Sequence, residues 1–595
     1  MEALKRKKRY KAKAPAQTIG EIKDIIRSEL GLSLQETLYH DERSRFHSCR
    51  ISIDSDGLGE FRIGTNGKGV EKNYALASAH GEFMERIQNN ALLSYDWFAR
   101  PAFVKSHGGE FYRFHQYLKD RGLLLKYNIA PDEKVFADKP EFPPEWDKLG
   151  IYENAEPGML TYLPFYNVFK DNVTYIPASV ISYRCTSNGM CAGNTPKEAM
   201  IQGICEIMER YALRLIFEKN LTLPTIPKEL FRGNLIYNHI VELEESRNWS
   251  IEIKDCSCNI GLPAIGILII DKSKTGYHFH IGADPSPITA LERSITEIYQ
   301  GRTDIQFHRF DIGRMAAIEN NNAEKEFECS RTFVDSTGQF PLSILSSENS
   351  YEFSGFDENY GLSDDSDLRL LTGLIRKLGF EMLVRDVSFL GFPAYRIYIP
   401  GMSEIFYVFD RPSTTIQSSD YFFTAHNIGQ ATREETETLI GSMESARLPY
   451  KLDFLNPSDD MAKDYDLSMC ILYGKVGNYE KSHTHLDKYI GKNPDDSSLF
   501  YRCLRDILYA KYVCKSKDNS FLFKLYDAEM IDKIVGMLEQ DGFLELFNLS
   551  SCFDCETCKI SDTCKLLNLI GVSKRIERVF EKHIPDQKDL AVFFS

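Results

Sequence analysis

A short acidic motif occurs twice in the sequence. "GEFMERI" spans 81–87 and "CEIMERY" spans 205–211, and both contain Glu-x-x-Glu-Arg. Residues three or four positions apart share one face of a helix, so each motif places two carboxylates side by side. Paired carboxylates suit a hard cation such as Mg²⁺, which commonly bridges them to phosphates. The motif therefore predicts metal-dependent chemistry on a phosphate compound.

The second copy lies in a helix predicted from Pro196 to Phe217. Its polar positions are Glu198, Gln202, Glu206 and Glu209, at spacings of four, four and three, and the residues between them are almost all apolar. An amphipathic surface helix is the alternative reading, but this stripe is too narrow for a solvent face and has no matching lysines. Buried carboxylates would protonate or need a cation.

The start of that helix allows two interpretations. "TPKE" (195–198) has the form of a capping box, in which Glu198 serves only the helix terminus. Asn194 and small residues precede it, and a helix N-terminus behind small residues is a natural anion site. The sequence has no Walker-A pattern and no set of kinase motifs, so a nucleotide site here would be of an unusual kind.

Two further predicted helices carry matching polar side chains. The helix at about 71–90 has Ser78, Glu82 and Glu85 on one face, and the helix at 286–302 has Arg293 and Glu297 four residues apart. Three helices can thus surround one cavity. The predicted Mg²⁺ ligands are Glu82, Glu85, Glu198, Glu206, Glu209 and Glu297. The arginines Arg86, Arg210 and Arg293 would balance their charge or hold phosphate oxygens.

An internal repeat connects the two acidic motifs. "TNGKGVEKNYALASAHGEFMERI" (65–87) and "SNGMCAGNTPKEAMIQGICEIMERYA" (187–212) share the plan of strand, glycine loop and helix. We therefore expect an α/β fold with an internally duplicated strand–loop–helix unit. After about residue 430 the pattern becomes helical. The predicted domains are a basic N-terminal segment (1–18), an α/β domain with the duplicated unit (19–450), and an all-α C-terminal domain (451–595).

The repeat, the loop "SNGMCAGNT", "ALERSITEIYQGR", "VDSTG" and "PGMSEI" resemble the YcaO family. The resemblance covers roughly residues 11–430. It implies a YcaO-type fold and an enzyme that uses ATP and Mg²⁺, and many members activate a peptide amide oxygen by phosphorylation. It implies catalytic roles for Glu206, Glu209, Arg210 and Arg293. The implied nucleotide contacts are Lys11 (or Lys13), Ala77, Ser78, Cys191, Asn194, Glu198, Gln202, Arg210, Arg293 and Glu297. Cys191 stands where relatives have serine.

The resemblance is nearest to the stand-alone bacterial branch of the family. That branch implies an accessory factor to methylthiolation of a ribosomal protein, with a methylthiotransferase or ribosomal protein as partner, a peptide or protein substrate, and a homodimer. The chain ends "LAVFFS", without the proline-rich tail of azoline-forming members, which argues against backbone cyclodehydration. The alternative function is a non-catalytic ATP-binding interaction protein that docks a modification enzyme through its C-terminal helices.

The C-terminal region contains two local motifs. Residues 466–494 form one helix–turn–helix pattern that resembles a tetratricopeptide repeat, and one unit is a weak signal. "CFDCETCKISDTC" (552–564) spaces its cysteines as Zn²⁺ or iron–sulfur ligands are spaced, with zinc slightly favoured. These cysteines are Cys552, Cys555, Cys558 and Cys564.

Composition limits the remaining classes of protein. The chain has 595 residues, too many for one ordinary core, and its net charge of −15 disfavours general nucleic-acid binding. No run of eighteen apolar residues and no secretion signal is seen, so we expect no membrane contact and a cytoplasmic location. The 14 cysteines are therefore expected to be reduced.

Overall fold

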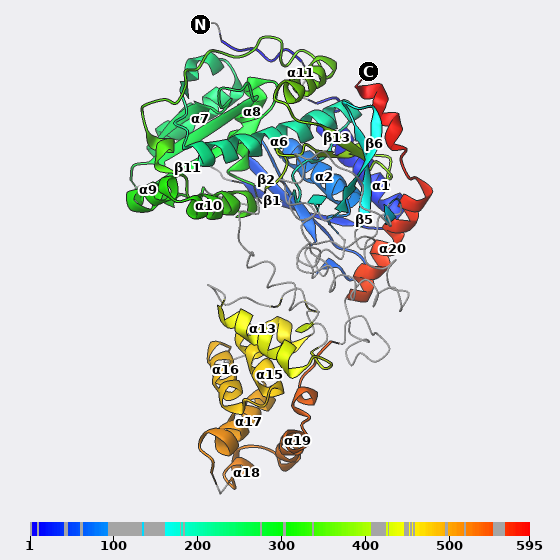
Figure 1. Cartoon of the computed structure of the whole chain (residues 1–595), viewed down its shortest axis with the longest axis vertical. Coiled ribbons are helices and arrows are strands. Elements are labelled where there is room, and N and C mark those ends of the chain that lie inside the picture. The colour runs from blue at the N-terminus through cyan, green and yellow to red at the C-terminus, as the bar shows by residue number, and fades with distance from the viewer. Residues whose placement is uncertain are drawn as a thin grey trace. The chain divides into compact units, whose positions relative to one another are not determined.

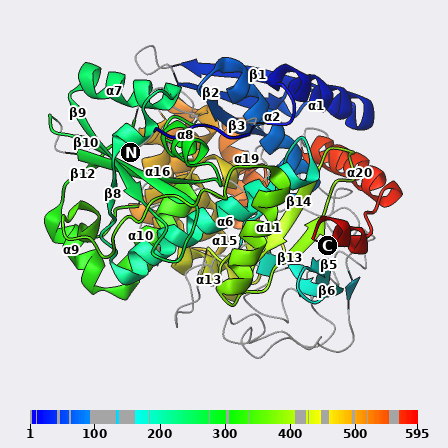
Figure 2. The same ribbon diagram turned by 90° about the horizontal axis from the view of Figure 1, so that it is seen from above.

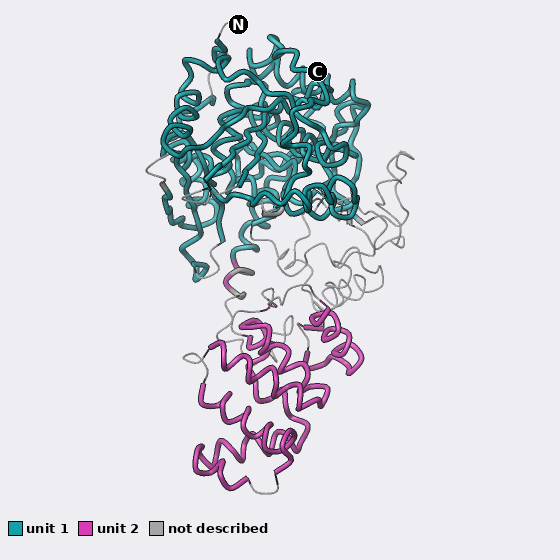
Figure 3. The backbone as a smooth tube through the Cα atoms, turned by 90° about the vertical axis from the view of Figure 1, so that its left-hand side faces the viewer, with its two compact units in different colours: residues 1–94, 129–409, 572–595 teal, residues 95–128, 410–571 magenta. Residues whose placement is uncertain are grey.

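The computed structural model divides the chain into two compact units. Unit 1 contains residues 1–94, 129–409 and 572–595, and unit 2 contains 95–128 and 410–571 (Figure 3). The predicted boundary near residue 450 lies inside unit 2. The residues that the structure describes are 3–8, 11–40, 46–59, 63–92, 132, 134–135, 161–178, 180–181, 185–273, 276–300, 305–335, 338–405, 424–425, 428–445, 452, 455, 459–493, 498–516, 519–550 and 566–594.

The first sheet of unit 1 is antiparallel and has three strands. Its strands are β1 (Leu34–His40), β2 (His47–Ile53) and β3 (Gly64–Gly69), in that order. Helix α2 (Lys72–Gln88) packs on β2 and β3, and α1 (Pro15–Leu30) packs on α2 (Figure 1). Helix α1 buries Ile22, Ile26 and Leu30 at a spacing of four. The sheet and α1 thus fix the position of α2 from two sides.

A second sheet, with strand order β12-β11-β10-β9-β8, is also antiparallel. Strands β10 (Ala264–Asp271) and β11 (Gly276–Ala283) follow one another in the chain and pair as a hairpin. Side chains of successive residues in β10 point to opposite faces of the sheet. Ile267 lies in one hydrophobic cluster with Ile236 and Leu291, whereas Leu268 lies in another cluster with Ile204. The other elements here are β8 (Thr225–Ile226), β9 (Trp249–Asp255), β12 (His308–Arg309), α7 (Leu235–Arg247) and α8 (Pro287–Glu297).

Helix α6 (Pro196–Lys219) lies between the second and third sheets, which explains its apolar sequence. It contacts β10 and β11 of the second sheet and β7 and β14 of the third. Thr195 caps its first turn by accepting the Glu198 N–H, Pro196 occupies the first position, and Asn220 ends it with a left-handed φ of 49°. The third sheet comprises β4 (Lys134–Val135), β5 (Thr161–Asn167), β13 (Leu383–Asp386), β14 (Ala394–Tyr398) and β7 (Met190–Ala192), with β6 (Asn172–Pro177) beside β5.

Further helices cover α6 and the third sheet. Helix α11 (Asp364–Lys377) packs against α6, as does α10 (Asn322–Asp335), which follows α9 (Ile312–Asn320) (Figure 2). The end of α20 (Leu566–Lys582) returns to unit 1, where the rings of Phe389 and Phe580 stack with centroids 4.4 Å apart. Gln587 accepts the Asp386 N–H at 2.7 Å and donates to its carbonyl at 3.1 Å. The return is therefore an ordered contact with β13.

The described part of unit 2 is helical, so the predicted α/β fold with a helical C-terminal region is confirmed. The predicted helix–turn–helix corresponds to α15 (Tyr465–Lys475) and α16 (Tyr479–Lys492), while its likeness to a tetratricopeptide repeat stays a prediction. The other helices are α13 (Arg433–Ser445), α14 (Asp460–Lys463), α17 (Leu499–Leu508), α18 (Leu522–Leu525) and α19 (Ala528–Glu539). Within the described ranges, no helix has both the length and the apolar character needed to cross a membrane.

Candidate functional site

Three strand–helix junctions of unit 1 share one register. The helices α2, α6 and α8 each begin five residues after a strand residue that packs against the same helix, namely Gly67, Cys191 and Gly282. Fifteen residues after those positions come Glu82, Glu206 and Glu297 (82 − 67, 206 − 191 and 297 − 282). The predicted duplication is therefore one of three equivalent strand–helix units. The third unit, β11–α8, escaped the sequence comparison because it lacks the Asn-Gly loop and the full Glu-x-x-Glu-Arg motif.

Small residues allow each strand to lie directly on its helix. A Cβ atom on Gly67 would lie 2.1 Å from the Ala75 carbonyl oxygen, and one on Gly282 would lie 2.4 Å from that of Ala290. In the α6 unit the glycine is on the helix instead, because a Cβ on Gly203 would lie 2.8 Å from the Cys191 sulfur. Each strand therefore contacts its helix at the same point of the register. The glutamate fifteen residues after that strand residue lies at the equivalent position of each helix.

This packing moves Cys191 away from the predicted nucleotide contacts. Cys191 is fully buried, its thiol is 3.5 Å from the Tyr395 carbonyl oxygen, and burial raises its pKa well above the usual range. Its side chain points from β7 into α6, because it occupies the strand position that lies on the helix. The structure therefore does not bring Cys191 into the site with the other predicted residues.

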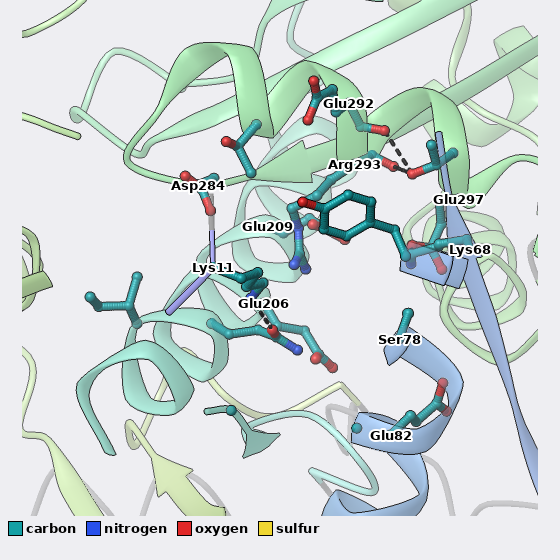
Figure 4. A pocket seen from close by; sticks show the side chains of 18 of the residues that line it. Lys11, Lys68, Ser78, Glu82, Glu206, Glu209, Asp284, Glu292, Arg293 and Glu297 are labelled. Atoms are coloured by element: carbon teal, nitrogen blue, oxygen red, sulfur yellow. Dashed lines mark hydrogen bonds and ion pairs between the residues drawn. The ribbon is translucent and has the colours of Figure 1, made fainter. Parts of the chain in front are cut away.

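One cavity of about 360 Å³ lies between α2, α6 and α8 (Figure 4). A cavity of this volume is within the range of small-molecule sites. All the other predicted site residues of unit 1 line it. They are Lys11, Lys13, Ala77, Ser78, Glu82, Glu85, Arg86, Asn194, Glu198, Gln202, Glu206, Glu209, Arg210, Arg293 and Glu297.

The N-terminal segment forms part of the wall beside α6. The carboxylate of Glu198 accepts the Ala12 N–H at 2.9 Å and lies 3.5 Å from the Lys11 ammonium, and the Asn194 amide donates to it at 3.0 Å. Burial acts to raise the pKa of Glu198, but these donors and the positive Lys11 outweigh it, so the pKa is lowered. Glu198 is thus held ionised in the cavity as well as lying in the first turn of α6.

Basic side chains pair with the glutamates on α2 and α6. Arg86 lies 3.3 Å from Glu82, Arg210 lies 2.9 Å from Glu206, and each pair spans one turn of its own helix. Glu209 accepts the Ala283 N–H at 3.1 Å. The acidic stripes are therefore balanced by nearby arginines or by a backbone donor.

Burial changes how readily several cavity groups ionise. It raises the pKa of Glu85 to about 8 and also raises that of Glu209. It lowers the pKa of Lys68 to about 8, with Arg293 acting in the same direction. A carboxylate that is difficult to ionise because of burial becomes easier to ionise when a cation binds beside it.

The donor chemistry fits Mg²⁺ and a phosphate compound. Mg²⁺ prefers carboxylate oxygens, and lysine and arginine side chains bind phosphate. In the part of the chain that the structure describes, no three His, Cys, Asp or Glu side chains converge as a ready metal cluster. The glutamates face one cavity but are held by protein cations or by backbone donors, so a metal ion would have to draw them away from those partners.

The buried state of Glu85 gives a prediction about pH. The unfolded chain should release this proton at the ordinary pKa of about 4.3, whereas the folded chain keeps it up to about pH 8. The folded state binds more protons across this window, so the free energy of unfolding should fall as pH rises.

Replacing Glu85 with glutamine should remove that dependence. Between pH 5 and 8, in metal-free buffer, we expect a flatter slope, by up to roughly 1 kcal/mol per pH unit. Urea unfolding at several pH values measures this, with the exposed Glu29→Gln variant as control. Parallel slopes for wild type and Glu85→Gln would contradict the burial argument.

The structure adds residues that the sequence analysis did not select. Lys68, Asp284 and Gln300 line the cavity, as do Arg6 and Lys8 of the N-terminal segment. Gln300 lies eighteen residues after Gly282, and Glu85 and Glu209 lie equally far after Gly67 and Cys191 (300 − 282, 85 − 67 and 209 − 191). Counting in the common register would have found Gln300. The predicted metal ligands Cys552, Cys555, Cys558 and Cys564 lie outside the described residues.

A cavity lined by carboxylates, lysines and arginines defines a protein suited to bind a divalent cation and a phosphate compound together. Residues 66–403, more than half of the chain, match the family model described as YcaO cyclodehydratase, ATP- and Mg²⁺-binding. The chain belongs to the YcaO family, as the sequence predicted.

Two curated bacterial proteins are similar to large parts of the chain. The Escherichia coli protein named "Ribosomal protein S12 methylthiotransferase accessory factor YcaO" is 27% identical over 422 residues, which cover 70% of this chain and 68% of the relative. An uncharacterized Haemophilus influenzae protein is 29% identical over 373 residues, covering 62% of this chain and 60% of that protein. The chain thus spans less than two thirds of the second relative.

Two solved structures match part of the chain at low sequence identity. YcaO from Methanopyrus kandleri, bound with AMPPCP and Mg²⁺, is 14% identical and has a TM-score of 0.42; the match covers 66% of this chain and 92% of that one. A heterocyclase in complex with substrate and cofactor is 16% identical, also with a TM-score of 0.42, and the match covers 67% and 54% of the two chains.

Proposed function

We propose that this chain is an enzyme that hydrolyses ATP with Mg²⁺ and activates a peptide or protein amide by phosphorylation. The observation that carries the proposal is the convergence of glutamates and basic side chains from α2, α6 and α8 on one cavity. A scaffold would gain nothing from burying carboxylates whose ionisation burial opposes.

The residues divide by the chemistry of their side chains. Glu206 and Glu209, with Glu82, Glu85 and Glu297, would hold Mg²⁺. Arg210, Arg293 and Lys11 would hold phosphate oxygens, since they face the same space. Mg-ATP, when bound, would supply the γ-phosphoryl group to the amide oxygen, with ADP as the leaving group. The protein's part is to hold the phosphates in line with that oxygen and to exclude water.

The biological role rests on the relatives. The name of the Escherichia coli protein supports a role as accessory factor to methylthiolation of a ribosomal protein, with a methylthiotransferase as partner. A homodimer and a cytoplasmic location stay predictions from the sequence. The same holds for Zn²⁺ or an iron–sulfur cluster at 552–564.

A second candidate function comes from unit 2. Its helices α17 and α18 expose large apolar side chains, including Leu499, Phe523 and Leu525, which are 53%, 54% and 61% exposed. Apolar side chains on exposed helices favour docking of another protein. The alternative is therefore a non-catalytic protein that binds ATP and docks a modification enzyme through these helices.

Nucleotide products distinguish the two candidates. The wild-type protein is incubated with Mg-ATP, with and without cell extract, and ADP, AMP and phosphate are measured. Steady ATP turnover that the extract accelerates supports an amide-activating enzyme. ATP binding without turnover under either condition supports the docking protein, and a chain that neither binds nor hydrolyses ATP excludes both.

A further inference from the structure

We propose that Lys68 competes with the divalent cation for the Glu297 carboxylate, so that the cation and the nucleotide bind cooperatively. The inference rests on the proposed function and deepens it, because it assigns to one lysine the coupling between the two ligands. Lys68 is a positioning residue in this scheme.

Lys68 connects two of the three strand–helix units. It lies on β3, and its ammonium contacts the Glu297 carboxylate at the end of α8 (Figure 4). The same ammonium donates to the Gln300 side-chain oxygen at 3.1 Å, and the Gln300 nitrogen lies 3.5 Å from Glu82. The Lys68 side chain is only 18% exposed, so this pairing is largely removed from water.

The common register shows why a lysine is present at this position. In α2 and α6 the glutamate is followed four residues later by an arginine, which pairs with it. The equivalent position after Glu297 is Gly301, so the register places no arginine one turn after this glutamate, and the arginine of α8, Arg293, comes one turn before it. The positions equivalent to Lys68 in the other two units are Ala192 and Ala283 (68 − 67, 192 − 191 and 283 − 282). The lysine is thus found only in the first of the three units, and it pairs with the glutamate that is not followed by an arginine one turn later.

Lysine and arginine respond differently when a metal ion arrives. A guanidinium has five donors in a fork and can serve a carboxylate and a phosphate together, whereas an ammonium is a compact point charge. A divalent cation at Glu297 would repel the Lys68 ammonium. Separated from its carboxylate, a largely buried ammonium is costly unless another anion accepts it.

A nucleotide supplies that anion. Lys68 lines the same cavity as Arg210 and Arg293, so a polyphosphate held there could accept the ammonium that the cation displaces. The bound nucleotide lowers the free-energy cost of displacing the Lys68 ammonium, and so it favours binding of the cation. By thermodynamic linkage the bound cation must favour binding of the nucleotide by the same factor. The cation alone should bind weakly, and the pair should bind well.

The test measures binding of Mn²⁺, a hard-cation substitute for Mg²⁺, by electron paramagnetic resonance. Titrations are made with and without AMPPCP, correcting for the complex that the two form in buffer. In the wild type, AMPPCP should tighten Mn²⁺ binding by about tenfold or more. In Lys68→Met, Mn²⁺ alone should bind about tenfold more tightly than in wild type, and the AMPPCP effect should shrink by a similar factor.

Two further variants keep the outcome interpretable. Lys72→Met removes an exposed lysine at the start of α2 and should behave as wild type. Lys68→Gln removes the charge but keeps a polar group for Gln300, so it serves if the methionine variant is unstable. If both Lys68 variants bind Mn²⁺ alone no more tightly than wild type, with unchanged coupling, the inference is overturned while the proposed function stands. If the wild type binds neither ligand, separately or together, the proposed function itself fails.

Discussion

Replacing Glu206 with glutamine is expected to lower ATP turnover by about 10²- to 10³-fold, the usual effect of removing one electrostatic group from a transition state. Glu206 lies on the cavity face of α6, is 16% exposed, and pairs with Arg210 at 2.9 Å. Glutamine keeps the size of the side chain but removes the charge that would hold Mg²⁺. Chromatographic measurement of ADP and AMP gives the rate.

A matched control lies on the same helix. Glu218 is 44% exposed near the end of α6 and also pairs with an arginine one turn away, Arg214, at 3.4 Å. Glu218→Gln removes the same charge from an equivalent local pair outside the cavity, so its turnover should equal that of wild type. Loss of activity in both variants would indicate a general effect on α6. Full activity in Glu206→Gln would remove this residue from the metal site.

The site residues on the helices could be predicted because helical spacing is local. A polar stripe in an apolar helix has few physical explanations, and the positions of Glu206 and Glu209 follow from α6 alone. Glu82 and Glu297 could be predicted for the same reason. The repeat then suggested that α2 and α6 are equivalent.

The residues that the sequence could not place depend on how strands lie on helices. Cys191 was expected to face the nucleotide, and its true direction follows from its contact with Gly203 on α6. Lys68 reaches Glu297 from a different unit, and no local pattern joins residues so far apart in the sequence. The third unit is defined by a contact between strand and helix, since Gly282 lies on α8 as Gly67 lies on α2. The return of 572–595 to unit 1 is likewise a long-range contact.

Replacing Gly282 with alanine is expected to destabilise the protein by roughly 1–3 kcal/mol, the usual cost of overpacking. Its new Cβ would lie 2.4 Å from the Ala290 carbonyl oxygen and 2.6 Å from the Ser294 nitrogen. Both are backbone atoms, so α8 as a whole must move. The buried Ser294 hydroxyl donates to the Ile265 carbonyl at 2.7 Å, which opposes that movement. The urea-unfolding midpoint measures the loss.

The same substitution should also weaken AMPPCP binding, because Arg293 and Glu297 move with α8. Gly373→Ala is the control, since Gly373 is exposed inside α11 and its added methyl group would meet nothing within 4 Å. That change should stabilise the protein by about 0.5–1 kcal/mol, because alanine favours a helix more than glycine does. A loss of stability in Gly282→Ala and a gain in Gly373→Ala would distinguish the effect of the close backbone contact from the effect of helix propensity. If Gly282→Ala were as stable as wild type, β11 could not lie directly on α8, and the common register would lose its physical basis.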